Sequence, residues 1–183
     1  MIEAVGQLTV VRHAPLRQAG RCIGRLDIVP LLSPAGAATV MQRALPDTID
    51  RIWTSPARRC AAPATLLGAA LGVPVMVDER VCELSFGRWE GSTWQAIERD
   101  DAIAVRRWMN DWMYTAPPGG ESGVDLLRRV RSWWESLDGL RHHLLVGHAG
   151  VIRALRMLAL ALTPSEAMTR SVRHLWPEQI PLP

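Results

Sequence analysis

The sequence predicts an α/β fold, a three-layer sandwich in which a mostly parallel central sheet is covered by helices on both faces. Short, nearly continuous apolar segments alternate with longer amphipathic or alanine-rich segments, as strands and helices do around a parallel sheet. Gly, Pro and small polar residues separate these segments. The chain has 183 residues and no internal repeat or low-complexity linker, so we expect one domain over residues 1–183.

The first half of the chain predicts three strands and two helices. Ser33-Pro34 has the pattern of a helix N-cap followed by a first-turn proline. The second helix is rich in alanine and leucine and is stopped by Gly72 and Pro74. The expected elements are a strand over 7–11, a loop over 14–30, a helix from 33 to about 45, a strand over 49–53, a helix over 57–71 and a strand over 75–77.

The second half predicts three further helices and one strand. Val124, Val130 and Leu137 lie at helical spacing on an amphipathic segment. The last expected helix is nearly all apolar and must be well buried. The expected elements are an irregular stretch over 78–91, a tryptophan-rich helix over 92–112, a break at 117–120, a helix over 121–137, a strand over 143–146 and a helix over 150–162.

Composition excludes several classes of protein. The hydrophobic fraction of 48% and charged fraction of 21% are those of a globular chain, not a disordered one. The apolar stretch over 155–162 is flanked and interrupted by Arg153 and Arg156 and is too short to span a bilayer. The first residues show no signal-peptide pattern. We therefore expect a soluble cytoplasmic protein without a membrane partner.

The charged residues and cysteines exclude further partners. All 21 basic residues are Arg, they are spread among acidic residues, and the net charge is only +3, so no nucleic-acid partner is expected. Cys22, Cys60 and Cys82 have no paired spacing, which favours reduced thiols over a disulfide or a metal site. No His/Asp cluster at ligand spacing is present, so we expect no metal and no cofactor.

Three groups of polar residues follow predicted strands, where ligands bind in open parallel sheets. They are Arg12-His13, the turn over 55–59 and Gly147-His148. A neutral imidazole is a good phosphorus nucleophile, and Arg12 could hold phosphoryl oxygens through two hydrogen bonds. A lone histidine after a buried strand is more often structural, so the prediction depends on the three groups meeting.

Two more segments supply groups suited to phosphate chemistry. His148 precedes a predicted helix, whose first backbone N–H groups, beginning at Ala149, form an anion site. The alternative is an ordinary strand-to-helix turn. Glu83 lies among Leu84, Phe86 and Trp89, surroundings that suit a carboxyl group acting as proton donor, although an isolated glutamate in a loop is weak evidence.

Together the segments Arg12-His13-Ala14, 54–59, 83–91 and 147–150 resemble the histidine phosphatase superfamily (phosphoglycerate mutase-like), in order, over residues 7–160. The resemblance implies that His13 is the nucleophile, Glu83 the proton donor and His148 the second histidine. It places Arg59, not Arg58, on the phosphate-binding arginine. Segments 20–27 and 117–122 look closest to the small bacterial branch that includes alpha-ribazole phosphatase.

The resemblance implies a phosphomonoesterase that hydrolyses a small-molecule phosphate ester through a phosphohistidine, with alpha-ribazole 5'-phosphate as one candidate substrate. Two alternatives stay open: a phosphoglycerate mutase, and a catalytically weak phospho-ligand-binding member of the same fold. A homodimer is also left open.

Trp89, Trp108 and Trp112 are candidates for a pocket wall that stacks on an aromatic substrate, against the more common alternative of ordinary packing. The last twenty or so residues do not resemble the family's closing strand, which we expect to be missing or replaced.

Overall fold

The sheet at the centre of the protein has five strands in the order β3-β2-β4-β1-β5. The computed structural model describes residues 6–18 and 20–183. All neighbouring strands are parallel except β1 and β5, which are antiparallel. The predicted mostly parallel sheet is therefore confirmed. The strands are β1 (Gln7–Arg12), β2 (Arg51–Thr54), β3 (Val75–Val77), β4 (His142–Gly147) and β5 (Glu178–Ile180).

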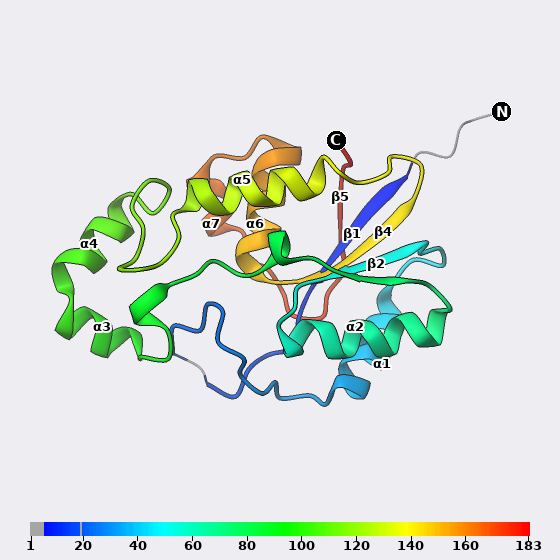
Figure 1. Cartoon of the computed structure of the whole chain (residues 1–183), viewed down its shortest axis with the longest axis horizontal. Helices are drawn as coiled ribbons and strands as arrows, with labels where there is room; N and C mark the ends of the chain where they lie inside the picture. Colours follow the sequence, from blue (N-terminus) through cyan, green and yellow to red (C-terminus); the bar gives the residue numbers. More distant parts are fainter. Residues whose placement is uncertain (1–5, 19) are drawn as a thin grey trace.

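Helices cover both faces of this sheet, as the sequence predicts (Figure 1). Helices α1 and α2 pack together on one face, and α5 and α6 pack together on the other. Helices α3 and α4 lie beyond the sheet, at one end of the molecule (Figure 1). The helices are α1 (Pro34–Ala44), α2 (Arg58–Leu71), α3 (Trp94–Asp100), α4 (Ala102–Asn110), α5 (Gly123–Trp134), α6 (Ala149–Leu160) and α7 (Pro164–Thr169), with short 3₁₀ helices η1 (Glu79–Val81) and η2 (Gly87–Trp89).

The central strands contribute side chains to two separate cores. In β1, Leu8 and Val10 belong to the core beneath α5 and α6, while Val11 belongs to the core beneath α1 and α2. In β4, Leu145 and Val146 divide in the same way. All five side chains are completely buried. Burial on both faces explains why these strands are continuously apolar in sequence and do not alternate with polar residues.

Predicted helix boundaries are confirmed where a capping residue marks them. The Oγ of Ser33 accepts a hydrogen bond from the backbone N–H of Gly36 at 3.1 Å, and Pro34 is the first residue of α1. Gly72 ends α2 in the left-handed conformation, with φ of 69°.

One expectation about the helices is wrong, and one helix was not predicted. Segment 92–112 is not one helix, because Asp101, with φ of −141° and ψ of 42°, separates α3 from α4. Helix α7 was not expected at all. Its start is marked in the sequence by Thr163 and Glu166, which form a capping box, and by Pro164 at the first helical position. That signal could have predicted the helix.

Strand β5 corrects the expectation that the closing strand is missing or replaced. It pairs antiparallel with β1, with Ile180 opposite Leu8. The strand is only three residues long and lies between Pro177 and Pro181. Prolines at the ends of an edge strand remove few of the hydrogen bonds between strands, so they are compatible with β5. A strand of three residues is too short to show an alternation of apolar and polar residues, which is why the sequence did not predict it.

The described helices are short. The longest, α2, has 14 residues, whereas a bilayer crossing needs about 20 apolar residues. No helix in residues 6–18 and 20–183 combines the length and apolarity of a membrane span.

Candidate active site

The carboxyl ends of β1 and β4 bring the two predicted histidines together. Strand β1 ends at Arg12, followed by His13, and β4 ends at Gly147, followed by His148. The backbone N–H of His13 donates to the carbonyl oxygen of Gly147 at 3.0 Å, so the parallel pairing continues just past the end of β1. The centroids of the two imidazole rings are 5.4 Å apart, and the ring planes meet at 67°.

The ring of His13 is held in one tautomer. Its Nδ1 lies 2.7 Å from the carbonyl oxygen of Ala14. A carbonyl oxygen only accepts hydrogen bonds, so Nδ1 carries the proton and Nε2 keeps its lone pair. The pKa of His13 is lowered to about 3, first because burial penalises the charged ring, and further because Arg59 and Arg12 repel a positive charge. His13 is therefore neutral at physiological pH, as a nucleophile requires.

His148 lies beside His13 and is also held by hydrogen bonds. Its Nδ1 is 3.4 Å from Nη2 of Arg59, and its Nε2 is 2.7 Å from Oγ of Ser55. A guanidinium only donates, so Nδ1 accepts and Nε2 donates to the hydroxyl. The pKa of His148 is well below its ordinary value because of burial, then because of the nearby Arg59 and His13. The sequence analysis gave Ser55 no role of its own.

Two arginines, the buried Arg59 and the half-buried Arg12, frame the histidines. Arg59 is in the first turn of α2 and is only 3% exposed, and its Nη atoms donate to the carbonyl oxygens of Gly24 and Leu26. Arg12 donates through Nη1 to the carbonyl oxygen of Val172 at 2.9 Å. The Nε atoms of both arginines are buried without a hydrogen-bond partner. Unpaired buried donors are costly, so these two N–H groups suit an acceptor such as a phosphoryl oxygen.

The neighbouring Arg58 has a different environment. Its side chain is 89% exposed and lies 4.0 Å from Asp27. The structure therefore brings Arg59 to the histidines and leaves Arg58 in solvent. That Arg59 binds the phosphate stays a prediction.

Glu83 reaches the same place from the segment between η1 and η2. Its Oε1 accepts hydrogen bonds from the backbone N–H groups of Gly150 and Leu84, both at 3.0 Å. Gly150 is the second residue of α6, directly after Ala149. Glu83 thus lies at the helix start that follows His148. Ala149 opens α6 next to His148, but its contact with a phosphate stays a prediction.

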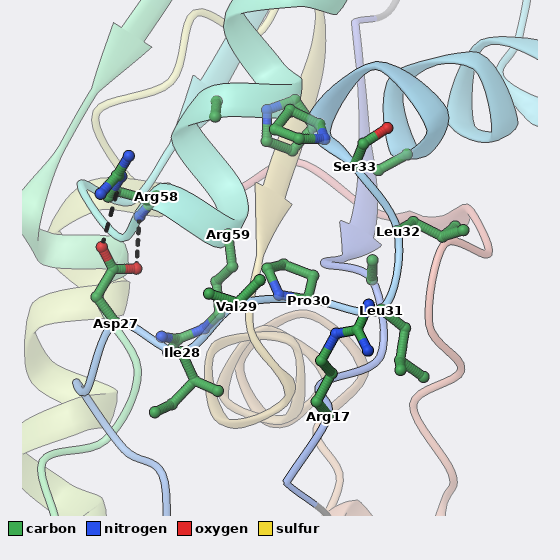
Figure 2. Close-up of a pocket in the computed structure, with 15 residues that line it drawn as sticks. Arg17, Asp27, Ile28, Val29, Pro30, Leu31, Leu32, Ser33, Arg58 and Arg59 are labelled. Carbon is green, nitrogen blue, oxygen red and sulfur yellow. Dashed lines mark hydrogen bonds and ion pairs between the residues drawn. The ribbon is translucent and has the colours of Figure 1, made fainter.

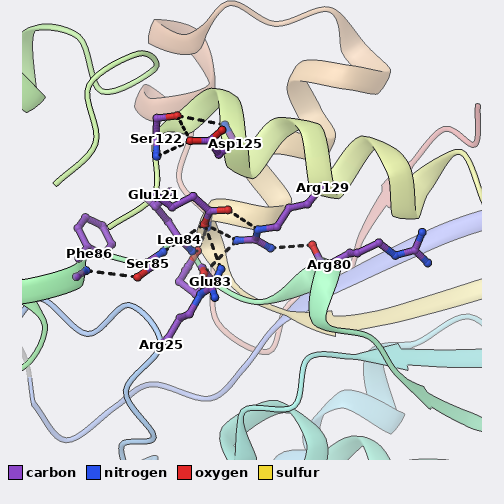
Figure 3. A network of polar contacts seen from close by, with 12 residues as sticks. Arg25, Arg80, Glu83, Leu84, Ser85, Phe86, Glu121, Ser122, Asp125 and Arg129 are labelled. Atoms are coloured by element: carbon purple, nitrogen blue, oxygen red, sulfur yellow. Dashed lines mark hydrogen bonds and ion pairs between the residues drawn. The ribbon is translucent and has the colours of Figure 1, made fainter. Parts of the chain in front are cut away.

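A polar network fixes the backbone of Glu83 (Figure 3). Arg25 and Arg129 donate to its carbonyl oxygen at 3.2 and 3.1 Å. Glu121 binds Arg129 through two hydrogen bonds of 2.7 and 2.9 Å and holds Arg25 at 3.4 Å. Sequence reasoning did not find this network, because its members lie far apart in the chain and contact the backbone of Glu83, which carries no sequence signal.

Two cavities border the site formed by the two histidines, Arg59 and Glu83. One of about 460 Å³ borders it through Ala14 and Arg59 and is walled mainly by apolar residues of the loop before α1 (Figure 2). A smaller one, of about 100 Å³, opens on Glu83 and Gly150 and is lined by Trp108 and other apolar side chains.

The three tryptophans considered for a pocket wall divide between two roles. Trp108 and Trp112 line the smaller cavity. Trp89 does not line it; its Nε1 donates to Asp101 at 3.1 Å and its ring packs edge-on against Trp108 and Trp94. For Trp89 the alternative of ordinary packing therefore holds.

Comparison with known proteins shows the family to which this chain belongs. The sequence pattern of the histidine phosphatase superfamily (branch 1) matches residues 8–175 of the chain. The chain belongs to this superfamily. The predicted resemblance is thus confirmed, and the match extends beyond residue 160, where the resemblance was expected to end.

The relatives of this histidine phosphatase differ in the substrates for which they are named. It is 32% identical over 157 residues to a Hydrogenobacter thermophilus protein named for phosphoserine phosphatase activity, covering 81% of this chain and 76% of that protein. It is 29% identical to the adenosylcobalamin/alpha-ribazole phosphatase of Escherichia coli, covering 66% of this chain and 61% of that enzyme. A solved mycobacterial glucosyl-3-phosphoglycerate phosphatase has a TM-score of 0.77 at 29% identity, covering 96% of this chain and 89% of that one.

Some relatives are much longer. Three mycobacterial proteins that are 37% identical over 123 residues align with 67% of this chain but only 30% of their own length.

Proposed function

We propose that this histidine phosphatase hydrolyses a small-molecule phosphate monoester through a phosphohistidine at Nε2 of His13. The observation that carries the proposal is the state of His13: buried, neutral and protonated at Nδ1, with two unpaired arginine Nε–H groups nearby. Neutral imidazole supplies the lone pair, and the arginines supply charge for the phosphoryl oxygens.

In the first step, Nε2 of His13 attacks phosphorus and the bond from phosphorus to the alcohol oxygen breaks. Glu83 gives its proton to that oxygen as the alcohol leaves. Arg12, Arg59 and the first N–H groups of α6, beginning at Ala149, hold the phosphoryl oxygens.

In the second step, water attacks phosphorus and gives a proton to Glu83, and the bond from phosphorus to Nε2 breaks. Inorganic phosphate leaves, His13 is neutral again and Glu83 is protonated for the next cycle. His148 stays next to the transferred group, oriented by Ser55 and Arg59. Positioning and charge neutralisation supply most of the acceleration in phosphoryl transfer.

The test is His13→Ala, measured with para-nitrophenyl phosphate and with a radiolabelled phosphoester. We expect turnover and labelling of the protein to be lost, because Nε2 of His13 is the proposed acceptor of the phosphoryl group. His142→Ala is the control, since His142 lies at the opposite end of β4 from His148. Labelling retained in His13→Ala would overturn the assignment.

A wild-type protein that binds phosphoesters without turnover would favour the alternative of a catalytically weak binding protein. Exchange of 3- for 2-phosphoglycerate would favour the alternative of a phosphoglycerate mutase.

For the substrate, we propose an alcohol with a flat apolar ring, alpha-ribazole 5'-phosphate being one candidate. The support is the cavity next to Glu83, where the leaving group must lie: Trp108, Trp112 and Phe86 contribute to its wall. Nε of Arg153, in the same wall, is buried without a partner and suits an acceptor on the ring. A panel of phosphoserine, glucosyl-3-phosphoglycerate and alpha-ribazole 5'-phosphate would test this. A higher kcat/KM for phosphoserine would contradict it.

We also propose that residues 1–183 act as one cytoplasmic domain. The support is that both cores are built on the same sheet, and that Cys22, Cys60 and Cys82 are free thiols, as is common in a reducing compartment.

A further inference from the structure

A third histidine, outside every segment that predicted the site, contacts His13. His174 follows α7 in the chain, and its ring centroid is 5.5 Å from that of His13, with the planes at 60°. Its Nδ1 lies 2.6 Å from the backbone carbonyl oxygen of His13. Because that oxygen only accepts, the Nδ1 of His174 carries the proton and donates.

The segment that carries His174 runs alongside the end of β1. Residue 174 forms a parallel bridge with Arg12, and the backbone N–H of Leu175 donates to the carbonyl oxygen of Arg12 at 2.9 Å. Arg12 in turn donates to the carbonyl oxygen of Val172. Three hydrogen bonds therefore join residues 172–175 to Arg12 and His13.

Both flanks of His174 are anchored in the hydrophobic cores. Val172 belongs to the core beneath α5 and α6, and Leu175 to the core beneath α1 and α2. Leu175 also has φ of 54°, a left-handed conformation that a leucine rarely adopts. Strained residues of this kind persist where the surrounding contacts determine the backbone, and they gather at functional sites.

We propose that His174 is a positioning residue for the nucleophile. The carbonyl group that it holds belongs to the peptide between His13 and Ala14, and the next carbonyl group, that of Ala14, holds Nδ1 of His13. His174 thus fixes the backbone that fixes the ring, and so keeps Nε2 aimed at phosphorus. This inference rests on the proposed role of His13.

The test compares His174→Ala with His174→Asn, because the amide nitrogen of Asn can take the place of Nδ1–H. We expect His174→Ala to slow formation of the phosphoenzyme by about ten- to a hundredfold, with little change in KM, since a small misplacement of a reacting group costs that much. His174→Asn should recover most of the rate. His142→Ala is the matched control.

Two kinetic results would overturn the proposal: a wild-type rate of phosphoenzyme formation in His174→Ala, or a rate in His174→Asn no better than in His174→Ala. A thermal melt of each variant detects unfolding. The ¹⁵N shifts of the His13 ring give a readout that does not depend on activity. We expect the Nδ1–H tautomer alone in wild type and His174→Asn, and both tautomers in His174→Ala. An unchanged tautomer in His174→Ala contradicts the inference even if the chain proves not to be a phosphatase.

Discussion

One backbone carbonyl group decides which nitrogen of His13 can react. The carbonyl oxygen of Ala14 accepts a hydrogen bond from Nδ1–H, and the low pKa of the buried ring keeps Nε2 unprotonated. His148 next to it has the opposite tautomer, because Arg59 donates to its Nδ1. Two adjacent imidazoles thus differ in role through their hydrogen-bond partners: one offers a lone pair, and the other offers a proton to Ser55.

At the scale of single residues, the role of Glu83 as proton donor can be tested by Glu83→Gln. The amide can still accept from the backbone N–H of Gly150, so the local structure should persist. We expect hydrolysis of alkyl phosphates to slow by about a hundredfold or more, the usual contribution of a general acid. Aryl phosphates with good leaving groups need no proton at the departing oxygen and should slow far less. The measurement is kcat for a series of phosphate esters with different leaving groups, and an equal loss across the series would argue against the acid role.

At the scale of elements, an ion pair between the buried Arg156 and the partly exposed Glu178 joins α6 to β5. Arg156 is 6% exposed and binds Glu178 at 2.6 Å. It also donates to the carbonyl oxygens of Arg170 and Ser171, just before the segment that carries His174. The pair therefore connects the edge strand, the helix that follows His148 and the segment that leads to His174.

We expect Glu178→Ala to destabilise the fold by about 2–4 kcal/mol, because it leaves the buried charge of Arg156 without its partner. The measurement is the free energy of unfolding in urea. The control is Asp100→Ala, which breaks an ion pair of nearly the same length, 2.7 Å, whose side chains are 74% and 64% exposed. Solvent screens an exposed pair of this kind, so its loss should change the stability little. Equal effects of the two substitutions would show that burial of Arg156 does not matter.

At the scale of the whole molecule, the fold buries several neutral histidines near arginines. Burial lowers the pKa of His13, His148, His143 and His174. The unfolded chain, with ordinary histidine pKa values near 6.5, binds more protons than the folded chain as the pH falls. The resulting stability is complete above about pH 6.5 and is lost as the pH falls toward the folded pKa values.

For His13 the folded pKa of about 3 sets the lower end of this window. We expect thermal stability to fall steadily from pH 6.5 to about pH 3, with up to about 5 kcal/mol attributable to His13 alone. Melting curves across this range, on wild type and on His13→Asn, measure it. The variant should lose less stability on acidification. Parallel curves for the two proteins would show that His13 is not buried in the neutral form.

Structural features that depend on local chemistry could be predicted from the sequence. Strands buried on both faces must be continuously apolar, so β1 and β4 were predicted to within a residue or two. Ser33 and Gly72 mark helix ends because they satisfy backbone groups there. Parallel topology then requires strand ends to share one edge, which is why His13 and His148 could be expected to meet.

Other features escaped because no local pattern carries them. Asp101 divides a helix that composition alone made continuous. The three-residue β5 is specified by its pairing with β1 and by the contact between Arg156 and Glu178, which are 22 residues apart. Arg129 acts on a backbone carbonyl group of Glu83, which any residue would have supplied.

The residue types and their order therefore determined the family, the sheet and the identity of the groups brought to its edge. Only the tertiary structure decided how those groups are held: the tautomer of His13, the partners of Arg59, and the place of His174. The physical reason is distance along the chain. Residue chemistry and periodicity can be read in sequence, whereas the contact between His174 and the carbonyl group of His13 joins positions 161 residues apart.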